Sequence, residues 1–150
     1  MLRMRWIVKD IMSNPVITTQ EETTSNIVAK IFEINSVDSV IVTNREGKPV
    51  GIITERNLVT NVLARNLEGE KVKAKEIMNR AIIKISPEET IVSAAREMNK
   101  KNTESLLVIY KNEPVGIVSG RNLLSFMPEF QEAFLERVRM EYSARTIQWE

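Results

Sequence analysis

The sequence is organised around a stretch that occurs twice: residues 49–58 read PVGIITERNL, and residues 114–123 read PVGIVSGRNL. Upstream of each copy, an Ile-Met pair recurs, at 11–12 and again at 77–78. Further identical pairs lie between these landmarks: Ile17 and Ile83, Thr24 and Thr90, Ala29 and Ala95, Ser39 and Ser105, Val42 and Val108. The chain therefore contains two copies of one unit, with a period of about 65 residues.

This repeat pattern predicts two halves that share one core. The period exceeds that of solenoids and propellers, and two copies do not make an open stacked array. A chain of 150 residues has the length of one ordinary domain. Half that length buries too little surface to be stable alone, so we expect a pair related by a pseudo-twofold axis.

Each copy contains a predictable series of short elements. Apolar and β-branched runs predict strands at 16–18, 39–43 and 49–53, and in the second copy at 81–84, 105–109 and 114–118. Between the first two strands of each copy, Thr24 and Thr90 are candidate N-caps for helices with apolar residues at helical spacing. A further helical segment follows each third strand. The unit is β-α-β-β-α, so the fold class is α/β (α+β), built from two such repeats.

The domain boundaries follow from the same landmarks. We expect the first repeat over 8–66, the second over 72–127, and a connector at 68–70. Residues 128–150 belong to neither copy, and an apolar stripe with Phe130 and Phe134 predicts a C-terminal helical extension there. That helix has two interpretations: packing on its own domain or a dimer partner, or docking of an effector protein.

Composition excludes several classes of function. The 21 basic and 20 acidic residues give a net charge of +1, which disfavours nucleic acid as a partner. The chain has no cysteine and no histidine, which removes thiolate nucleophiles, Cys/His metal sites and the usual proton shuttle. No apolar run is long enough to span a membrane, so we expect a cytoplasmic protein.

The end of each repeated stretch has residues suited to anion binding. Thr54 and Ser119 place a hydroxyl at the predicted start of a helix, where free backbone N–H groups favour an anion. Arg56 and Arg121, two residues later, are candidates for a bidentate phosphate contact. The simpler interpretation is that the hydroxyls are N-caps and the arginines are solvated surface charges.

With these motifs in register, the sequence resembles a tandem pair of CBS (cystathionine-β-synthase-type) domains. The resemblance covers about residues 8 to 127. It implies clefts between the two repeats that bind AMP, ADP, ATP or S-adenosylmethionine, a homodimer, and regulation of an effector protein. It assigns Asn57 and Asn122 to the ribose, although that position in the family is more often Asp.

The resemblance also implies where a purine lies, between the first strand and the loop before the second. The positions are Ile17, Val37, Asp38 and Ser39 in one copy, and Ile83, Thr103, Glu104 and Ser105 in the other. Gly120 stands where the first copy has Glu55, which predicts more room for a charged phosphate group at the second motif. Asp38 and Glu104 have a second interpretation as ordinary loop charges.

The sequence thus favours a stand-alone regulatory module over an enzyme. It has no nucleophile–base pair and no metal-ligand cluster, so we expect neither catalytic residues nor a catalytic cofactor. One alternative is a structural dimerisation module whose clefts are unused. A nucleic-acid-binding protein is the other, with Lys71, Lys73 and Lys75 as a modest basic patch.

Overall fold

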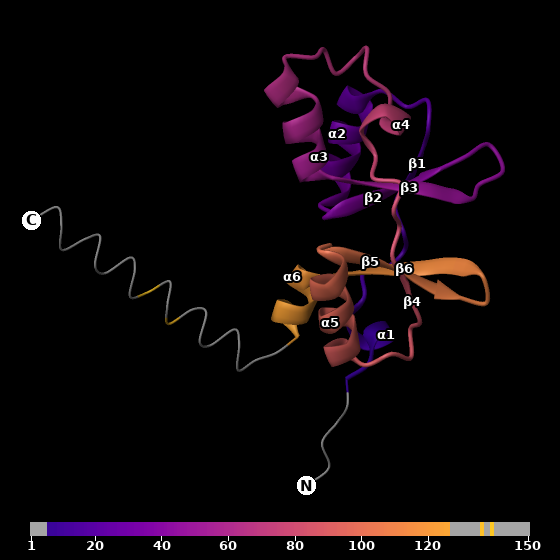
Figure 1. The fold of residues 1–150 in the computed structure, drawn as a ribbon, viewed down its shortest axis with the longest axis vertical. Helices are drawn as coiled ribbons and strands as arrows, with labels where there is room; N and C mark the ends of the chain where they lie inside the picture. The colour runs from indigo at the N-terminus through magenta and orange to yellow at the C-terminus, as the bar shows by residue number, and fades with distance from the viewer. Residues whose placement is uncertain (1–5, 127–135, 137–138, 140–150) are drawn as a thin grey trace, which may run out of the picture.

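The computed structural model describes residues 6–126, 136 and 139, and forms two similar halves stacked end to end (Figure 1). The elements that precede the connector are α1 (Val8–Ile11), β1 (Thr18–Gln20), α2 (Ser25–Asn35), β2 (Ser39–Thr43), β3 (Pro49–Thr54), α3 (Glu55–Asn61) and the 3-10 turn η1 (Leu63–Arg65). The same order then returns as α4 (Ala74–Ile77), β4 (Lys84–Ile85), α5 (Ile91–Lys101), β5 (Ser105–Tyr110), β6 (Glu113–Ser119) and α6 (Gly120–Ser125).

The predicted β-α-β-β-α order is confirmed in both copies. Several details differ. The one-turn helices α1 and α4 were not predicted. β1 begins at Thr18 rather than at residue 16 and β4 at Lys84 rather than at residue 81, because Val16 and Ile82 pack between the two sheets instead of pairing in a strand. Thr24 precedes α2 as predicted, but its hydroxyl donates to Asn26 Oδ1 at 2.6 Å rather than capping a backbone amide, whereas Thr90 Oγ1 accepts from Ser93 N–H at 3.0 Å.

Each half has one three-stranded sheet with the same topology. In the first sheet β2 is central, parallel to β1 and antiparallel to β3, and in the second β5 is central between β4 and β6. The parallel pairs require a crossover, which α2 and α5 provide. The antiparallel pairs are hairpins. Their turns lie at residues 44–48 and 111–112.

The two sheets face each other and form a shared core. Side chains alternate along a strand, so Val40 and Val42 point to the helices of their own half while Ile41 points to the other sheet. The shared core contains four buried side chains, two from each half: Ile41, Ile52, Leu107 and Ile117. Central strands buried on both faces explain their unbroken apolar runs.

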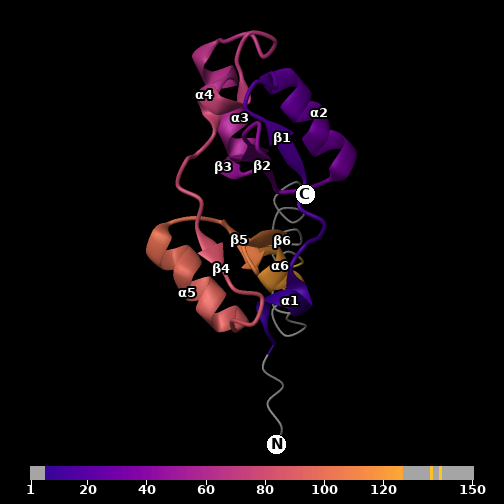
Figure 2. The same ribbon diagram turned by 90° about the vertical axis from the view of Figure 1, so that its right-hand side faces the viewer.

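The leading segment of each repeat packs in the opposite half. Val8 and Ile11 of α1 are buried in the core of the second half, whereas Ala74 and Ile77 of α4 are buried in the core of the first. Figure 1 shows α1 beside α5 and α6, and α4 beside α2 and α3, and Figure 2 shows the same arrangement from the side. The halves therefore exchange their leading segments.

This exchange accounts for the repeated glycines. A Cβ at Gly51 would overlap the Met78 side chain, and a Cβ at Gly116 would lie 2.6 Å from Met12 Sδ and 2.9 Å from the Ser13 carbonyl oxygen. Both methionines belong to the repeated Ile-Met pairs. The close approach of the exchanged segment thus requires a residue without a side chain on β3 and β6.

The predicted C-terminal helix over 128–150 lies outside the described residues except for Glu136 and Arg139. Among the helices that the structure describes, none is both long and apolar enough to cross a membrane.

Candidate functional site

The two helix starts after β3 and β6 have matching capping geometry. Thr54 Oγ1 accepts from the Asn57 N–H at 3.4 Å, and Asn57 Oδ1 accepts from the Thr54 N–H at 2.8 Å. Ser119 and Asn122 repeat both bonds, at 3.3 and 2.8 Å. These pairs are reciprocal capping boxes. The simpler interpretation of Thr54 and Ser119 as N-caps is therefore correct, and a ligand-binding role would be additional to it.

Each helix start faces a loop of the opposite half across a cavity. The first cavity, which we call the Arg56 cleft, has a volume of about 630 Å³. Its lining is Ile52, Thr54, Arg56, Asn57, Asn79, Ala95, Met98, Asn99, Asn102, Thr103, Glu104 and Ser105. The second, which we call the Arg121 cleft, has a volume of about 120 Å³. Its lining is Ser13, Pro15, Ser36, Val37, Asp38, Ser39, Ile117, Ser119, Arg121 and Asn122.

This arrangement brings together most of the residues that the sequence singled out. It is crosswise, because each cleft combines residues from both halves. The loop before β2 meets the helix start of the second half, and the loop before β5 meets the helix start of the first half. A third cavity of about 570 Å³ lies between the two helix starts and includes Arg56, Gly120 and Arg121 in its lining. The two clefts are thus parts of one groove between the halves.

Polar contacts between the halves hold the Arg121 cleft. Ser119 Oγ donates to Asp38 Oδ2 at 3.1 Å, and the Arg121 guanidinium lies 3.3 Å from Asp38 Oδ1. The Asn122 side-chain amide donates to Ser13 Oγ at 3.1 Å. Asp38 is the recipient of two of these contacts, and its side chain is only 35% exposed.

The same positions in the Arg56 cleft are open. Within residues 6–126, the Arg56 guanidinium, the Asn57 side-chain NH2 and the Glu104 carboxylate form no hydrogen bond or ion pair. Thr54 Oγ1 donates only to Asn57 Oδ1 of its own helix, at 3.0 Å. This cleft therefore presents unpaired donors beside a larger space.

One buried hydroxyl in the Arg121 cleft has no partner. Ser39 is 4% exposed. Among the described residues, its Oγ is a buried side-chain polar atom that forms no hydrogen bond. A buried unpaired hydroxyl costs free energy unless a partner arrives. Because Ser39 lines the cavity, a polar group of a bound molecule is a suitable partner.

Two of the residues assigned to the purine lie beside the clefts rather than in their linings. Ile17 and Ile83 are partly buried against the cores of their own halves. Their carbonyl oxygens accept from the N–H groups of Ile41 and Leu107, at 3.0 and 2.9 Å. The sequence in turn missed Ser13 and Asn79, which line the clefts. Each of them directly follows an Ile-Met pair, and this equivalent position in the two repeats could have identified them.

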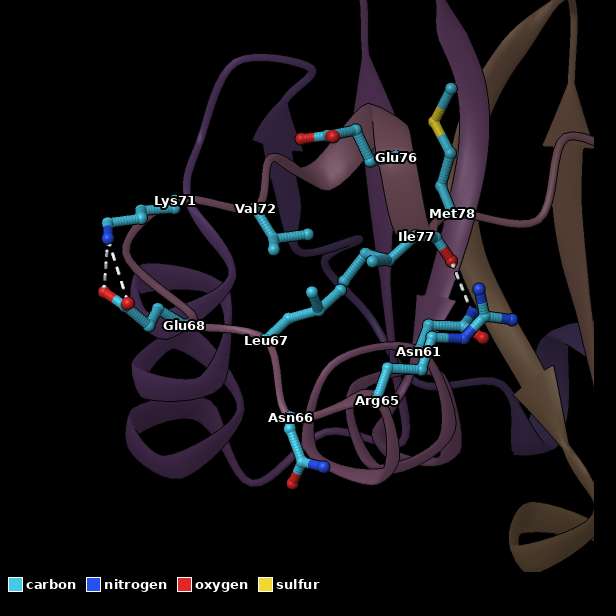
Figure 3. Close-up of a pocket in the computed structure, with 10 residues that line it drawn as sticks. All are labelled: Asn61, Arg65, Asn66, Leu67, Glu68, Lys71, Val72, Glu76, Ile77 and Met78. Atoms are coloured by element: carbon cyan, nitrogen blue, oxygen red, sulfur yellow. Dashed lines mark hydrogen bonds and ion pairs between the residues drawn. The ribbon is translucent and has the colours of Figure 1, made fainter.

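A further cavity, of about 670 Å³, lies away from both clefts (Figure 3). It is formed by α3, the connector and α4, where Lys71 and Glu68 make an ion pair at 2.8 Å and the Asn61 amide donates to the Ile77 carbonyl at 3.4 Å. All of its lining comes from residues 61–78. A molecule bound there would not contact the second sheet, in contrast to one bound in either cleft.

Comparison with known proteins places this geometry in a family. The CBS domain model matches residues 8–64 and 74–129. An uncharacterised protein of Methanopyrus kandleri, MK0525, is 28% identical over 122 residues, which cover 81% of this chain and 62% of the relative. This chain thus spans less than two thirds of that relative's length.

Two solved structures share the fold. The CBS domain pair of protein MJ0100, solved in complex with 5′-methylthioadenosine and S-adenosyl-L-methionine, is 31% identical, with a TM-score of 0.70 over 79% of this chain and 93% of that chain. A hexameric CBS-CP12 protein from bloom-forming cyanobacteria is 25% identical, with a TM-score of 0.77 over 94% of this chain and 82% of that chain. Because the family model matches both repeats, and the crosswise clefts lie between them, this chain belongs to the CBS domain family as a tandem pair.

Proposed function

We propose that this chain is a regulatory module that senses an adenosine-containing ligand in the clefts between its two CBS repeats. The observation that carries the proposal is the crosswise construction of the clefts. Each cleft combines a helix start from one half with the loop of the other half. A ligand bound there touches both halves, so its binding free energy depends on how the halves are placed.

The side chains in the clefts match the groups of an adenosine compound. The Arg56 guanidinium and the Asn57 NH2 have no partner within residues 6–126; the first is suited to phosphate oxygens and the second to a ribose hydroxyl. The unpartnered Ser39 hydroxyl suits a ring nitrogen or a ribose hydroxyl. MJ0100, the relative with two adenosine compounds in its structure, supports this class of ligand.

The mechanism that we propose is linkage between binding and the arrangement of the halves. A ligand at a hundredfold excess over its Kd stabilises the form that binds it by about 2.7 kcal/mol. It transmits a signal only if it binds two arrangements of the halves, or of a dimer, with different affinity. We propose that a homodimer of this chain passes that difference to an effector protein in the cytoplasm. The hexameric CBS-CP12 relative supports oligomerisation in general.

The test is a thermal-shift panel of the purified protein with AMP, ADP, ATP, S-adenosylmethionine and GTP, followed by calorimetry on each compound that raises Tm. We expect a selective rise with one or more of the adenosine compounds and none with GTP. Arg56→Ala is expected to weaken the binding of phosphorylated compounds without lowering Tm of the free protein, because Arg56 is exposed and unpaired in the described part of the chain.

The contrary outcome is equally clear. If no adenosine compound at millimolar concentration changes Tm and calorimetry detects no heat of binding, the sensing function is wrong. The clefts would then serve only to join the halves, and the structural dimerisation module would be the better description. Measurement of the oligomeric state by sedimentation would be the next step.

A further inference from the structure

The two clefts are lined by equivalent residues, but their arginine side chains differ in whether they form an ion pair. In the Arg56 cleft the cation is unpaired among the described residues, and the cavity has about 630 Å³. In the Arg121 cleft the cation is 74% exposed but paired with Asp38. The cavity of this cleft has about 120 Å³, and Arg121 and Asp38 also line the cavity of about 570 Å³ between the helix starts. The pseudo-twofold symmetry of the fold thus does not extend to the polar side chains of the site.

Asp38 accounts for the difference. Its Oδ2 accepts from Ser119 Oγ at 3.1 Å, a hydroxyl that also lies 2.9 Å from Asn122 Oδ1, and its Oδ1 forms an ion pair with the Arg121 guanidinium at 3.3 Å. A hydroxyl at a helix start and a guanidinium two residues later are the donors that a phosphate group would use. The Asp38 carboxylate therefore pairs with the Ser119 hydroxyl and the Arg121 guanidinium, the two groups that an incoming phosphate would need.

The counterpart residue in the other repeat does not act in this way. Glu104 lines the Arg56 cleft at the matching position, but among the described residues its carboxylate forms no hydrogen bond or ion pair with Arg56 or Thr54. The expectation that Gly120 makes the second motif more tolerant of phosphate stays a prediction. A Cβ at Gly120 would meet no atom within 4 Å, and the adjacent Arg121 forms an ion pair with Asp38.

We propose that Asp38 is a specificity-determining residue that divides the ligands between the clefts. The Arg121 cleft takes an adenosine compound without a phosphate group, and the Arg56 cleft takes the phosphorylated compound. The inference rests on the proposed adenosine-binding function and deepens it. A phosphate entering the Arg121 cleft would lose the pairing energy of Arg121 with Asp38 and would meet the carboxylate as a like charge.

The test compares AMP with adenosine, since the two differ only in the phosphate. Calorimetry on the wild-type protein is expected to give one AMP and two adenosine molecules per chain. Asp38→Asn keeps the size of the side chain and removes its charge. In that variant we expect a second AMP per chain, with an increase in affinity at the Arg121 cleft of about tenfold or more.

Two further variants locate the sites. Arg56→Ala in the wild-type background is expected to remove AMP binding and to retain adenosine at the Arg121 cleft. Glu33→Gln removes one negative charge from the exposed surface of α2, outside the linings of both clefts, and should leave the AMP stoichiometry at one. Asp38→Ala, checked by circular dichroism for an intact fold, should behave like Asp38→Asn.

The results of these experiments distinguish a failure of the role of Asp38 from a failure of the proposed adenosine-binding function on which it rests. Two AMP molecules per wild-type chain with equal affinity would overturn the role of Asp38 and leave adenosine binding intact. A single AMP per chain in both Asp38 variants would do the same. Absence of binding by both AMP and adenosine would overturn the proposed function, and the inference with it.

Discussion

At the scale of single residues, the asparagine at the third position of each helix determines what the cleft offers. Asn57 Oδ1 is used by the Thr54 backbone, and Asn122 Oδ1 by the Ser119 backbone, each at 2.8 Å. An aspartate there would have a second carboxylate oxygen left to accept from ribose hydroxyls. An asparagine has only its NH2 left, and that of Asn122 already donates to Ser13 Oγ at 3.1 Å, whereas that of Asn57 has no hydrogen bond among the described residues. Each cleft therefore has an NH2 donor where the commoner family residue has an acceptor, and the donor is unpaired in the Arg56 cleft.

The glycines on β3 and β6 give a prediction about stability at this scale. Gly116→Val is expected to lower the free energy of unfolding by about 1–3 kcal/mol or more, because the new side chain overlaps Met12 and the Ser13 carbonyl. Urea denaturation followed by circular dichroism measures this loss.

Gly120→Ala is the matched control for the glycine prediction. A Cβ at Gly120 meets no atom within 4 Å, and alanine is the better helix former at the start of α6, so its stability should be equal or up to about 1 kcal/mol higher. Equal losses in the two variants would show that crowding by Met12 is not the reason for the glycine.

At the scale of elements, the exchanged helices α1 and α4 are attached to their host halves by their first residues. The Ala74 N–H donates to the Thr23 carbonyl at 2.7 Å, and the Val8 N–H donates to the Glu89 carbonyl at 2.8 Å. In the first half, side chains strengthen the attachment. The Glu22 carboxylate accepts from Lys73 Nζ and from Lys75 Nζ, the latter at 2.6 Å.

This attachment predicts a pH dependence. The hydrogen bonds from Lys73 and Lys75 lower the pKa of Glu22 from 4.5 to about 2, and the pKa of Lys75 is raised by the same contact. Since the folded-state pKa of Glu22 is depressed, its contribution to stability is present above pH 4.5 and is lost as the pH falls toward 2. Both partners are exposed, so the effect on the free energy of unfolding is modest.

The measurement is the free energy of unfolding by urea at several pH values between 6 and 2 for wild type and Glu22→Gln. We expect the wild type to lose more stability over this interval than the variant. Glu88→Gln, which removes a carboxylate that has no ion pair among the described residues, should follow the wild-type slope. Parallel curves for wild type and Glu22→Gln would exclude the attachment as a source of stability.

At the scale of the whole molecule, the halves are joined by the core between the sheets and by the exchanged helices. The side chains of Ile41, Ile52, Leu107 and Ile117 contact one another across the pseudo-twofold axis. The core of each half is also incomplete without the leading helix of the other repeat: α4 completes the first half and α1 completes the second. The molecule should therefore unfold as one cooperative unit.

The corresponding prediction concerns Leu107, which is fully buried between the sheets. Leu107→Ala should lower the free energy of unfolding by about 2–5 kcal/mol while the transition stays single. Circular dichroism reports both halves, and Trp6 fluorescence in a Trp149→Phe background reports the second half. The two probes should give the same midpoint.

Leu124→Ala is the control for Leu107→Ala, because Leu124 is 55% exposed and its truncation should change stability little. Separate midpoints for the two probes in Leu107→Ala would mean that the halves unfold independently, and that the shared core does not couple them.

Local patterns were sufficient for the repeat, the element order and the helix starts. The run at 39–43 became β2 with the predicted bounds, because a β-branched apolar stretch of that length has few alternatives. Thr54 and Ser119 were recognised as helix starts because capping is a contact between residues three apart. The one-turn helices α1 and α4 were missed, since segments of four residues carry too little periodicity to be detected.

The sequence by itself determined that two copies of one α/β unit share a core, since repetition and hydrophobic periodicity are properties of the chain. Only the tertiary structure decided which half hosts α1 and α4, and that each loop meets the helix start of the opposite repeat. It also decided that Asp38 pairs with Arg121 while Glu104 leaves Arg56 free. Such contacts join residues that are far apart in the sequence, 81 positions in the case of Asp38 and Ser119, and no local pattern specifies them.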